Sequence, residues 1–171
     1  MPIIKNRDQR VAVFVDVQNM YYTAKHLFSS KVNFGGILKE SVGDRKLIRA
    51  TAYAVKAQMP EEKSFFDALQ KSGFEVKTKD LQVFGDGTKK ADWDVGLAMD
   101  IIKMSPSVDS IILVSGDGDY IPLVEYLQNH GKLVEVVAFG RSSSQNLVNK
   151  ADDFLDLEEI KSKVLLKYNK K

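Results

Sequence analysis

Residues 111–126, IILVSGDGDYIPLVEY, constrain the fold of this chain more than any other stretch. The four apolar residues 111–114 predict a buried parallel strand, and the Ser-Gly-Asp-Gly-Asp run after them predicts a tight turn into an amphipathic helix. Asp117 and Asp119 therefore follow a strand at its carboxyl end. In open α/β sheets that edge binds ligands, because loops and helix amino termini converge there.

A second strand, near the amino terminus, ends in a similar way. Residues 11–15 are apolar, and the sequence DVQN, which begins with Asp16 and ends with Asn19, comes directly after them. If the two strands are neighbours in one parallel sheet, Asp16 and Asp117 face each other across a cleft. Asn19 begins the next helix, where it is an N-cap, a residue that positions a ligand, or both.

The composition bounds the class of protein. The chain has 171 residues, 44% of them apolar, which suffices for one domain with a substantial core. It has no cysteine, which excludes disulfides, thiolate metal sites and cysteine nucleophiles and fits a cytoplasmic protein. No apolar run approaches the roughly 18 residues of a membrane span, so we expect a soluble protein without a membrane partner. The net charge is +2, so attraction to nucleic acid must come from local patches.

Strands alternate with helices along the sequence, which predicts a three-layer α/β domain with a mainly parallel sheet of five or six strands. One domain spans 1–171, with its core at about 10–155 and a carboxy-terminal helix and basic tail at 156–171. The expected strands are 11–15, 46–55, 74–77, 111–114, 132–139 and an edge strand at 153–155. The expected helices are 17–28, a short one within 29–45, 61–72, 91–104, the segment after the SGDGD turn, 145–150 and 158–168, the last leading into a frayed, solvated end.

The segment before and within the fourth of these helices holds further polar candidates. The run ADWDVGLAMDIIKM predicts a helix with Asp92 as N-cap and Asp94 in its first turn. Asp100 lies six residues after Asp94, roughly 9 Å along the axis and about 120° around it, so the two cannot share one small ion in a regular helix. Asp100 is therefore better explained as a structural carboxylate, with a weaker claim as a ligand. Trp93 either stacks on a base or packs on the domain.

Several residues around these elements are candidates for contact with a substrate. Four lysines surround a Gly-Asp-Gly turn at 85–87, where they form either solvated surface or a basic rim that holds phosphates; they are Lys77, Lys79, Lys89 and Lys90. Ser115 beside the SGDGD turn and Arg141 in a Gly-Arg-Ser loop are further candidates. His26 and His130 lie on helices with no evident acid or base partner, which argues against a two-histidine ribonuclease mechanism.

The predicted sheet edge collects four carboxylates, with Asn19 nearby; they are Asp16, Asp94, Asp117 and Asp119. Two carboxylates about 4 Å apart repel by roughly 4 kcal/mol at an effective dielectric near 20. A cation or a bound proton must therefore offset the repulsion within the cluster. Oxygen-only ligands favour Mg²⁺ or Mn²⁺, which keep several waters and leave positions open for phosphate. Such a site suits phosphodiester hydrolysis and needs no protein nucleophile.

Three ordered motifs resemble those of the NYN (LabA/DUF88-like) domains, relatives of the PIN nucleases: FVDVQN, KKADWDVGLAMDII and LVSGDGDYIPLVEYL. The resemblance covers about residues 10–155. It implies a PIN-like fold, a divalent metal site and ribonuclease activity on single-stranded or structured RNA. By motif, the same four aspartates match the acidic positions and Asn19 matches the asparagine of the first motif. The family's middle motif usually has Lys-Gly before a small residue and one aspartate, whereas this chain offers Asp92 and Asp94, of which Asp94 better fits the VGLAMD that follows.

Other functions remain open at this point. The main alternative is a non-catalytic RNA- or metal-binding regulatory module that keeps the cleft without turnover. A haloacid-dehalogenase-like phosphatase would need an aspartate two positions after Asp16, where this chain has Gln18. A dinucleotide-binding turn would need a glycine at Ile121, and the two turn carboxylates would repel pyrophosphate. The sequence leaves a homodimer open.

Overall fold

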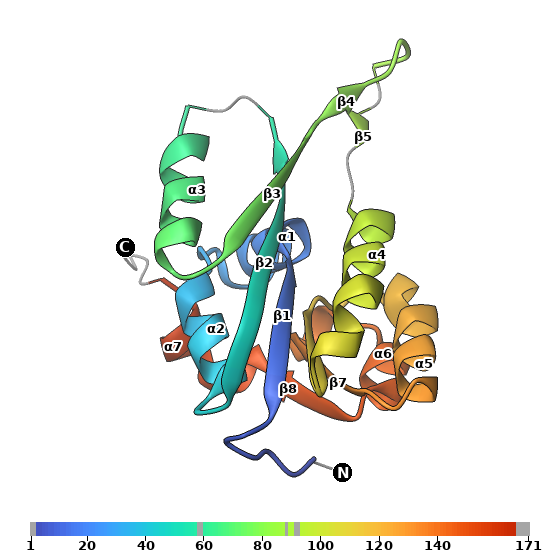
Figure 1. Cartoon of the computed structure of the whole chain (residues 1–171). Helices are drawn as coiled ribbons and strands as arrows, with labels where there is room; N and C mark the ends of the chain where they lie inside the picture. Colours follow the sequence, from blue (N-terminus) through green and yellow to red (C-terminus); the bar gives the residue numbers. More distant parts are fainter. Residues whose placement is uncertain (1–2, 58–59, 88, 91–92, 167–171) are drawn as a thin grey trace.

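The structure is a computed structural model that describes residues 3–57, 60–87, 89–90 and 93–166. Its centre is a six-stranded, all-parallel sheet with strand order β3-β2-β1-β6-β7-β8, and helices cover both faces of this sheet (Figure 1). A separate antiparallel pair, β4 and β5, lies between β3 and the next helix. The strands are β1 Arg10–Asp16, β2 Lys46–Lys56, β3 Glu75–Asp80, β4 Gln82–Val83, β5 Lys89–Lys90, β6 Ser110–Val114, β7 Leu133–Ala138 and β8 Asp153–Asp156.

Two hydrophobic cores sandwich the sheet, which explains why β1 is a continuous apolar run. Val11, Val13 and Val15 pack into one core with α1, α2, α3 and α7, whereas Ala12 and Phe14 pack into the other with α4, α5 and α6. Successive residues of a strand point to opposite faces, so a strand buried on both sides has no polar position. The helices are α1 Val17–Phe28, α2 Phe34–Val42, α3 Glu62–Lys71, α4 Asp94–Met104, α5 Ile121–Asn129, α6 Gln145–Lys150 and α7 Lys161–Val164.

The side on which the chain adds new strands to the sheet changes between β1 and β6, although all six strands stay parallel. From β1 the chain adds β2 and then β3 on one side, and it later adds β6, β7 and β8 on the other. The two central strands pair in parallel up to Val15 opposite Val114. Connections that leave neighbouring strands toward opposite faces open a crevice at their carboxyl ends. The last residue of β1, Asp16, therefore lies beside the turn that follows β6.

The end of the chain differs from the expected helix over 158–168. The segment forms a 3-10 turn at Leu157–Ile160, then the short α7, and then an extended residue, Leu165, that pairs antiparallel with Val32. The amide of Asn33 donates to the carbonyl of Val164 at 2.7 Å, and the amide of Leu166 donates to the segment before α2. These bonds take the place of continued helical bonds, so the chain up to Leu166 is docked on the segment before α2; the frayed end expected for residues 167–171 lies outside the described residues.

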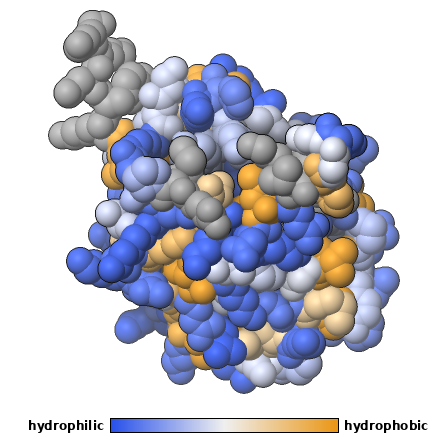
Figure 2. Space-filling view, turned by 90° about the horizontal axis from the view of Figure 1, so that it is seen from above, coloured by the Kyte–Doolittle hydropathy of each residue, from blue (hydrophilic) through white to orange (hydrophobic). Residues whose placement is uncertain are grey.

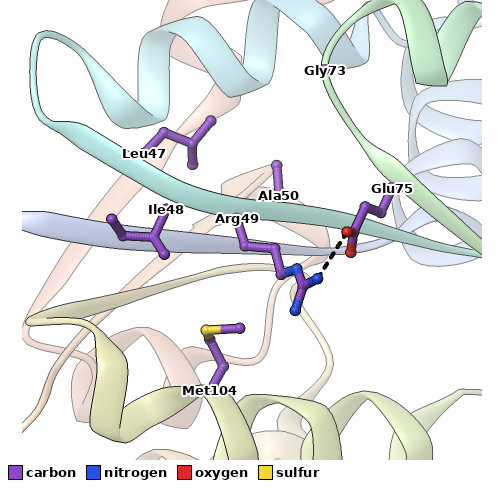
Figure 3. A pocket seen from close by; sticks show the side chains of 7 residues that line it. All are labelled: Leu47, Ile48, Arg49, Ala50, Gly73, Glu75 and Met104. Carbon is purple, nitrogen blue, oxygen red and sulfur yellow. Dashed lines mark hydrogen bonds and ion pairs between the residues drawn. The ribbon is translucent and has the colours of Figure 1, made fainter.

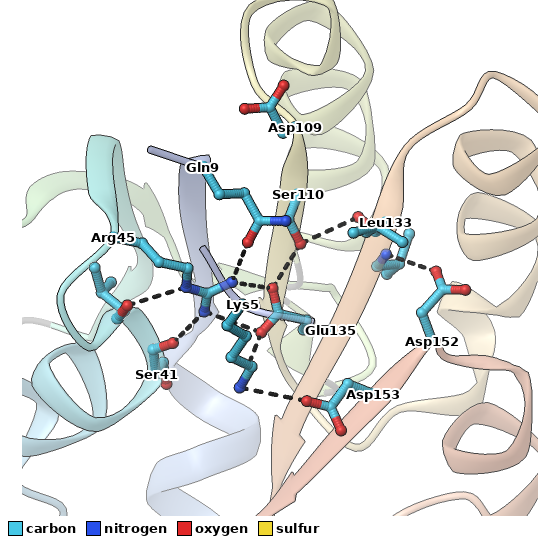
Figure 4. A network of polar contacts seen from close by, with 12 residues as sticks. Lys5, Gln9, Ser41, Arg45, Asp109, Ser110, Leu133, Glu135, Asp152 and Asp153 are labelled. Atoms are coloured by element: carbon cyan, nitrogen blue, oxygen red, sulfur yellow. Dashed lines mark hydrogen bonds and ion pairs between the residues drawn. The ribbon is translucent and has the colours of Figure 1, made fainter. Parts of the chain in front are cut away.

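A buried charge network lies near the amino ends of β6 and β7 (Figure 4). Arg45 and Glu135 form two bonds, Nη1 to Oε2 at 2.7 Å and Nη2 to Oε1 at 3.0 Å, with side chains only 1% and 5% exposed. Ser110 donates to the same carboxylate at 2.6 Å, and Lys5 lies 3.5 Å from it. Arg45 also donates to the Ser41 carbonyl at the end of α2. The network ties the loop after α2 to β6 and β7.

None of the helices in the described part of the chain is both long and apolar enough to cross a membrane.

Candidate metal centre

Asp16 joins β1 to α1 and is held by the start of that helix. It is the N-cap of α1, and its Oδ1 accepts the amide of Asn19 at 3.2 Å. The side chain of Asn19 has a different partner, because its Oδ1 accepts the amide of Gly116 at 3.0 Å. Asn19 thus cross-links the first turn of α1 to the turn after β6 and does not cap the helix itself.

The turn after β6 brings a second carboxylate beside Asp16. Fully buried Ser115 donates from Oγ to Asp16 Oδ2 at 3.4 Å and accepts the amide of Asp117 at 3.2 Å. Asp117 in turn caps a 3-10 turn, Gly118–Tyr120, by accepting the amide of Asp119 at 2.9 Å. Ser115 therefore bonds to both aspartates from between them, and its contact with a substrate stays a prediction.

The glycines of the SGDGD turn are required by close packing. A Cβ on Gly116 would lie 2.7 Å from Ser143 Oγ, and one on Gly118 would lie 2.8 Å from Ser144 Oγ. The amide of Ser144 donates to the carbonyl of Gly116 at 2.9 Å. The loop after β7 thus closes directly onto the turn that carries Asp117, and the glycines allow that approach.

The third carboxylate comes from α4. Asp94 is the first residue of this helix, and the hydroxyl of Tyr120 donates to its Oδ1 at 3.1 Å. Tyr120 is only 2% exposed, and burial together with the charges of the nearby carboxylates raises its pKa, so the hydroxyl stays protonated and remains a donor. Sequence reasoning missed Tyr120, although its place directly after GDGD was a usable signal.

One oxygen from each of Asp16, Asp94 and Asp117 lies within 4.8 Å of the others. Burial, followed by the charges of Asp94 and Asp117, raises the pKa of Asp16 to about 6, against the opposing effect of its bonds from Asn19 and Ser115. The donor set is oxygen only and partly open to solvent, as a hard divalent cation that keeps several waters requires. These three residues fit Mg²⁺ or Mn²⁺, and a bound cation would offset the repulsion from Asp94 and Asp117, which adds to the effect of burial on the pKa of Asp16.

Two predicted acidic residues lie outside this cluster. Asp119 is exposed, and it supports the site through the bond from its amide to Asp117. Asp100 accepts the hydroxyl of Tyr53 at 2.8 Å and the ammonium of Lys77 at 2.7 Å. Burial opposes the ionised form of Asp100, yet the bonds from Lys77 and Tyr53 lower its pKa below the usual value, as expected for a structural carboxylate. The third acidic candidate, Asp92, lies outside the described residues.

The basic candidates have different surroundings. Arg141 donates from Nε to both oxygens of Glu158, at 3.1 and 3.0 Å, and its guanidinium lies over the ring of Phe28 at 5.3 Å. Lys89 and Lys90 form β5, in the hairpin that rises beyond the carboxyl ends of β1 and β2 (Figure 1). Seen from this end, the described surface is mostly hydrophilic with separate hydrophobic spots (Figure 2).

A shallow cavity of about 420 Å³ lies elsewhere, at the first half of β2 and the start of β3 (Figure 3). Leu47, Ile48 and Met104 supply apolar lining, and Arg49 and Glu75 form a salt bridge of 3.0 Å across it. None of the three clustered aspartates lines it, so this cavity is not the metal centre.

Comparison with known proteins agrees with this arrangement. The family model of the NYN domain matches residues 10–158. The chain is 28% identical, over 167 residues, to the Low amplitude and bright protein LabA of Synechococcus elongatus, which covers 91% of this chain and 88% of that protein. A crystal structure of a protein of unknown function from Vibrio parahaemolyticus superposes with a TM-score of 0.85 at 36% identity, covering 96% of this chain and 100% of that one. The chain therefore belongs to the NYN domain family.

Proposed function

We propose that this protein is a metal-dependent ribonuclease that hydrolyses RNA phosphodiester bonds with Mg²⁺ or Mn²⁺. The observation that carries the proposal is the convergence of Asp16, Asp94 and Asp117, three carboxylates from three separate elements, within 4.8 Å. Membership of the NYN family, whose motifs relate it to the PIN nucleases, supports the same chemistry.

The residues of the site have different roles in the proposed reaction. A divalent ion held by the three aspartates would lower the pKa of a water molecule and stabilise the charge that develops on the phosphate. Tyr120 and Ser115 hold Asp94 and Asp16 in place by donating to them. Asn19 fixes the turn after β6 against α1. Asp119 is exposed and its amide donates to Asp117, and we propose it as a further ligand of the ion.

The two histidines take no part in this scheme. His26 stacks on Tyr22 with ring centroids 6.4 Å apart, and His130 stacks on Tyr126 at 4.0 Å. His130 also has Nδ1 2.7 Å from the carbonyl of Tyr126. Each histidine thus pairs with its own helix, and neither is brought to the aspartate cluster.

Labelled single-stranded RNA incubated with purified protein and Mn²⁺ or Mg²⁺ tests the proposal. We expect the wild-type protein to cleave the RNA. EDTA should abolish this cleavage, and the Asp16→Asn variant should show none. Binding without cleavage would favour the regulatory-module alternative. Equal cleavage by both proteins would show that a contaminating nuclease, and not this site, is responsible.

Replacing Lys89 and Lys90 together with alanine is expected to weaken RNA binding. We propose that β5 contacts phosphates from its place beyond the carboxyl edge of the sheet. Each lost contact lowers the slope of log affinity against log salt by roughly one unit, so the double variant loses up to about two. Filter binding of a non-cleavable RNA at several salt concentrations measures this slope. An unchanged slope would assign both lysines to solvated surface.

Metal affinity and stability should depend on pH in opposite directions. The pKa of Asp16 is about 6 in the folded state and 3.8 in the reference state, so its protonated form favours folding. That stabilising contribution is complete below pH 3.8 and is lost as the pH rises through about 6. Ionisation is also required for metal binding, so the apparent Kd for Mg²⁺ should fall about tenfold from pH 5 to pH 7.

Calorimetric Mg²⁺ titration and denaturation of the metal-free protein across that pH range check both trends. Asp16→Asn is the control, because it lacks the titrating group. A wild-type-minus-variant difference in unfolding free energy that rises with pH would contradict the assignment.

A further inference from the structure

We infer that Trp93 is a positioning residue that sets the distance between Asp94 and Asp16 by anchoring the start of α4 to β2. This role of Trp93 rests on the metal centre of the proposed ribonuclease. Because Trp93 would affect the geometry of the cation site, metal binding tests its role without any RNA.

The amino terminus of α4 has no side-chain cap. Trp93 occupies the N-cap position, with φ −110° and ψ 6°, and its side chain makes no capping bond. Its carbonyl accepts the amide of Leu97 at 2.7 Å, which begins the helix. The indole instead reaches across to the sheet, where Nε1 donates to the carbonyl of Ala54 at 2.8 Å. The side chain of the residue directly before Asp94 is thus bonded to a strand, while its backbone carbonyl begins the helix.

This bond reaches the strand that neighbours Asp16. In the parallel pairing of β1 with β2, Asp16 stands opposite Tyr53. Ala54, which accepts the indole, is the next residue of β2. The bond therefore connects the helix that carries Asp94 to a backbone position adjacent to the partner of Asp16. A strand in the middle of a hydrogen-bonded sheet is rigid. The bond from the indole to β2 therefore fixes the position of the start of α4, and with it the position of Asp94.

The indole is partly buried and contacts three side chains or backbone positions around it. Tyr53 meets it edge to face with centroids 5.3 Å apart, and the ammonium of Lys79 lies 4.9 Å from the ring centroid. Gly96 faces the six-membered ring, because a Cβ added there would lie 2.9 Å from Cε3 and 3.1 Å from Cζ3 of Trp93. These contacts favour packing over base stacking for Trp93.

Gly96→Ala tests the inference from the other side of the indole. Helix propensity alone favours alanine over glycine in α4, so a loss of Mn²⁺ affinity in this variant cannot come from helix propensity. The added Cβ must displace the indole, and with it the anchor of Asp94. We expect the Kd for Mn²⁺ to rise about three- to tenfold, the effect of weakening one hydrogen bond.

Two further variants complete the comparison. Trp93→Phe keeps an aromatic ring and loses the N–H donor, and we expect it to raise the Kd for Mn²⁺ by a similar factor. Gly35→Ala is the matched control, since Gly35 is also helical, lies in α2, and would place its Cβ 3.1 Å from the Ser72 hydroxyl. It should bind Mn²⁺ as the wild type does.

Titration calorimetry with Mn²⁺ and thermal unfolding of the metal-free proteins provide the measurements. Trp93 is the only tryptophan of the chain, so its fluorescence should also respond to Mn²⁺ in the wild type and in Gly35→Ala, but not in Asp94→Asn. Unchanged Mn²⁺ affinity in both Gly96→Ala and Trp93→Phe would overturn the inference. A wild type that binds Mn²⁺ but cleaves no RNA would overturn only the ribonuclease proposal, and the affinities of the variants would still decide the role of Trp93.

Discussion

Replacing Asp16 with asparagine is expected to abolish divalent-metal binding and RNA cleavage while making the metal-free protein more stable. The folded site raises the pKa of Asp16 from 3.8 to about 6, so its charge destabilises the folded state at neutral pH. A shift of roughly two units corresponds to about 3 kcal/mol, and because the side chain is partly open to solvent we expect a gain of about 1–3 kcal/mol in unfolding free energy. Asparagine caps a helix as well as aspartate does, so the start of α1 is retained.

The loss of function in this variant should be large. Changes to residues that only support a metal ligand lower affinity or activity 10- to 100-fold, so removing a ligand should lower cleavage by at least about 100-fold. Urea denaturation in EDTA at pH 7.5, Mn²⁺ titration and RNA cleavage measure the three effects. Asp109→Asn is the control of opposite sign, because hydrogen bonds from Arg10 lower the pKa of Asp109 and its charge favours folding. An Asp16→Asn protein that is less stable than the wild type in EDTA would contradict this account of the cluster.

Replacing Arg45 with methionine should give the largest loss of stability, about 3–5 kcal/mol. The substitution leaves Glu135, whose side chain is 5% exposed, without its main partner. Lys5 lies 3.5 Å from that carboxylate and offsets part of the loss, so we expect a value near the lower end. Most of the penalty comes from the buried charge that remains and not from the lost pair itself.

Urea denaturation of two further variants isolates this effect. Arg49→Met breaks an ion pair with Glu75 in which both side chains are about half exposed, and it should cost no more than about 1 kcal/mol. Adding Glu135→Gln to Arg45→Met removes the stranded charge and should restore part of the stability. Equal effects of Arg45→Met and Arg49→Met would show that burial does not govern the Arg45 pair.

The fold could largely be predicted from the sequence, because its signals are local. Apolar runs predicted the central strands, alternation with β-branched residues predicted β2, and the succession of strands and helices predicted the layers, as the six-stranded sheet confirms. The helix predicted for the carboxy-terminal segment was wrong. The backbone there forms hydrogen bonds with residues 31–33, which are distant in the sequence, and the helix ends early. The β4–β5 hairpin has strands of two residues, too short for any periodicity to reveal.

The site could be predicted less completely. Strand ends placed Asp16 and Asp117 at one edge, and the first turn of the expected helix added Asp94; the structure brings these three together. The bonds of Tyr120 and Trp93 join different elements, so their partners could not be predicted, although the place of Tyr120 directly after GDGD marked it as a candidate. Asp119 as a metal ligand and Arg141 as a substrate contact stay predictions, and the structure pairs Arg141 with Glu158.

Anomalous diffraction from a crystal soaked in Mn²⁺ at pH 7.5 tests the metal centre most directly. We predict a strong peak between Asp16, Asp94 and Asp117, at about 2.0–2.2 Å from an oxygen of each, and no such peak in Asp16→Asn. A wild-type crystal that takes up Mn²⁺ only at other positions, with the three carboxylates turned apart, would contradict it.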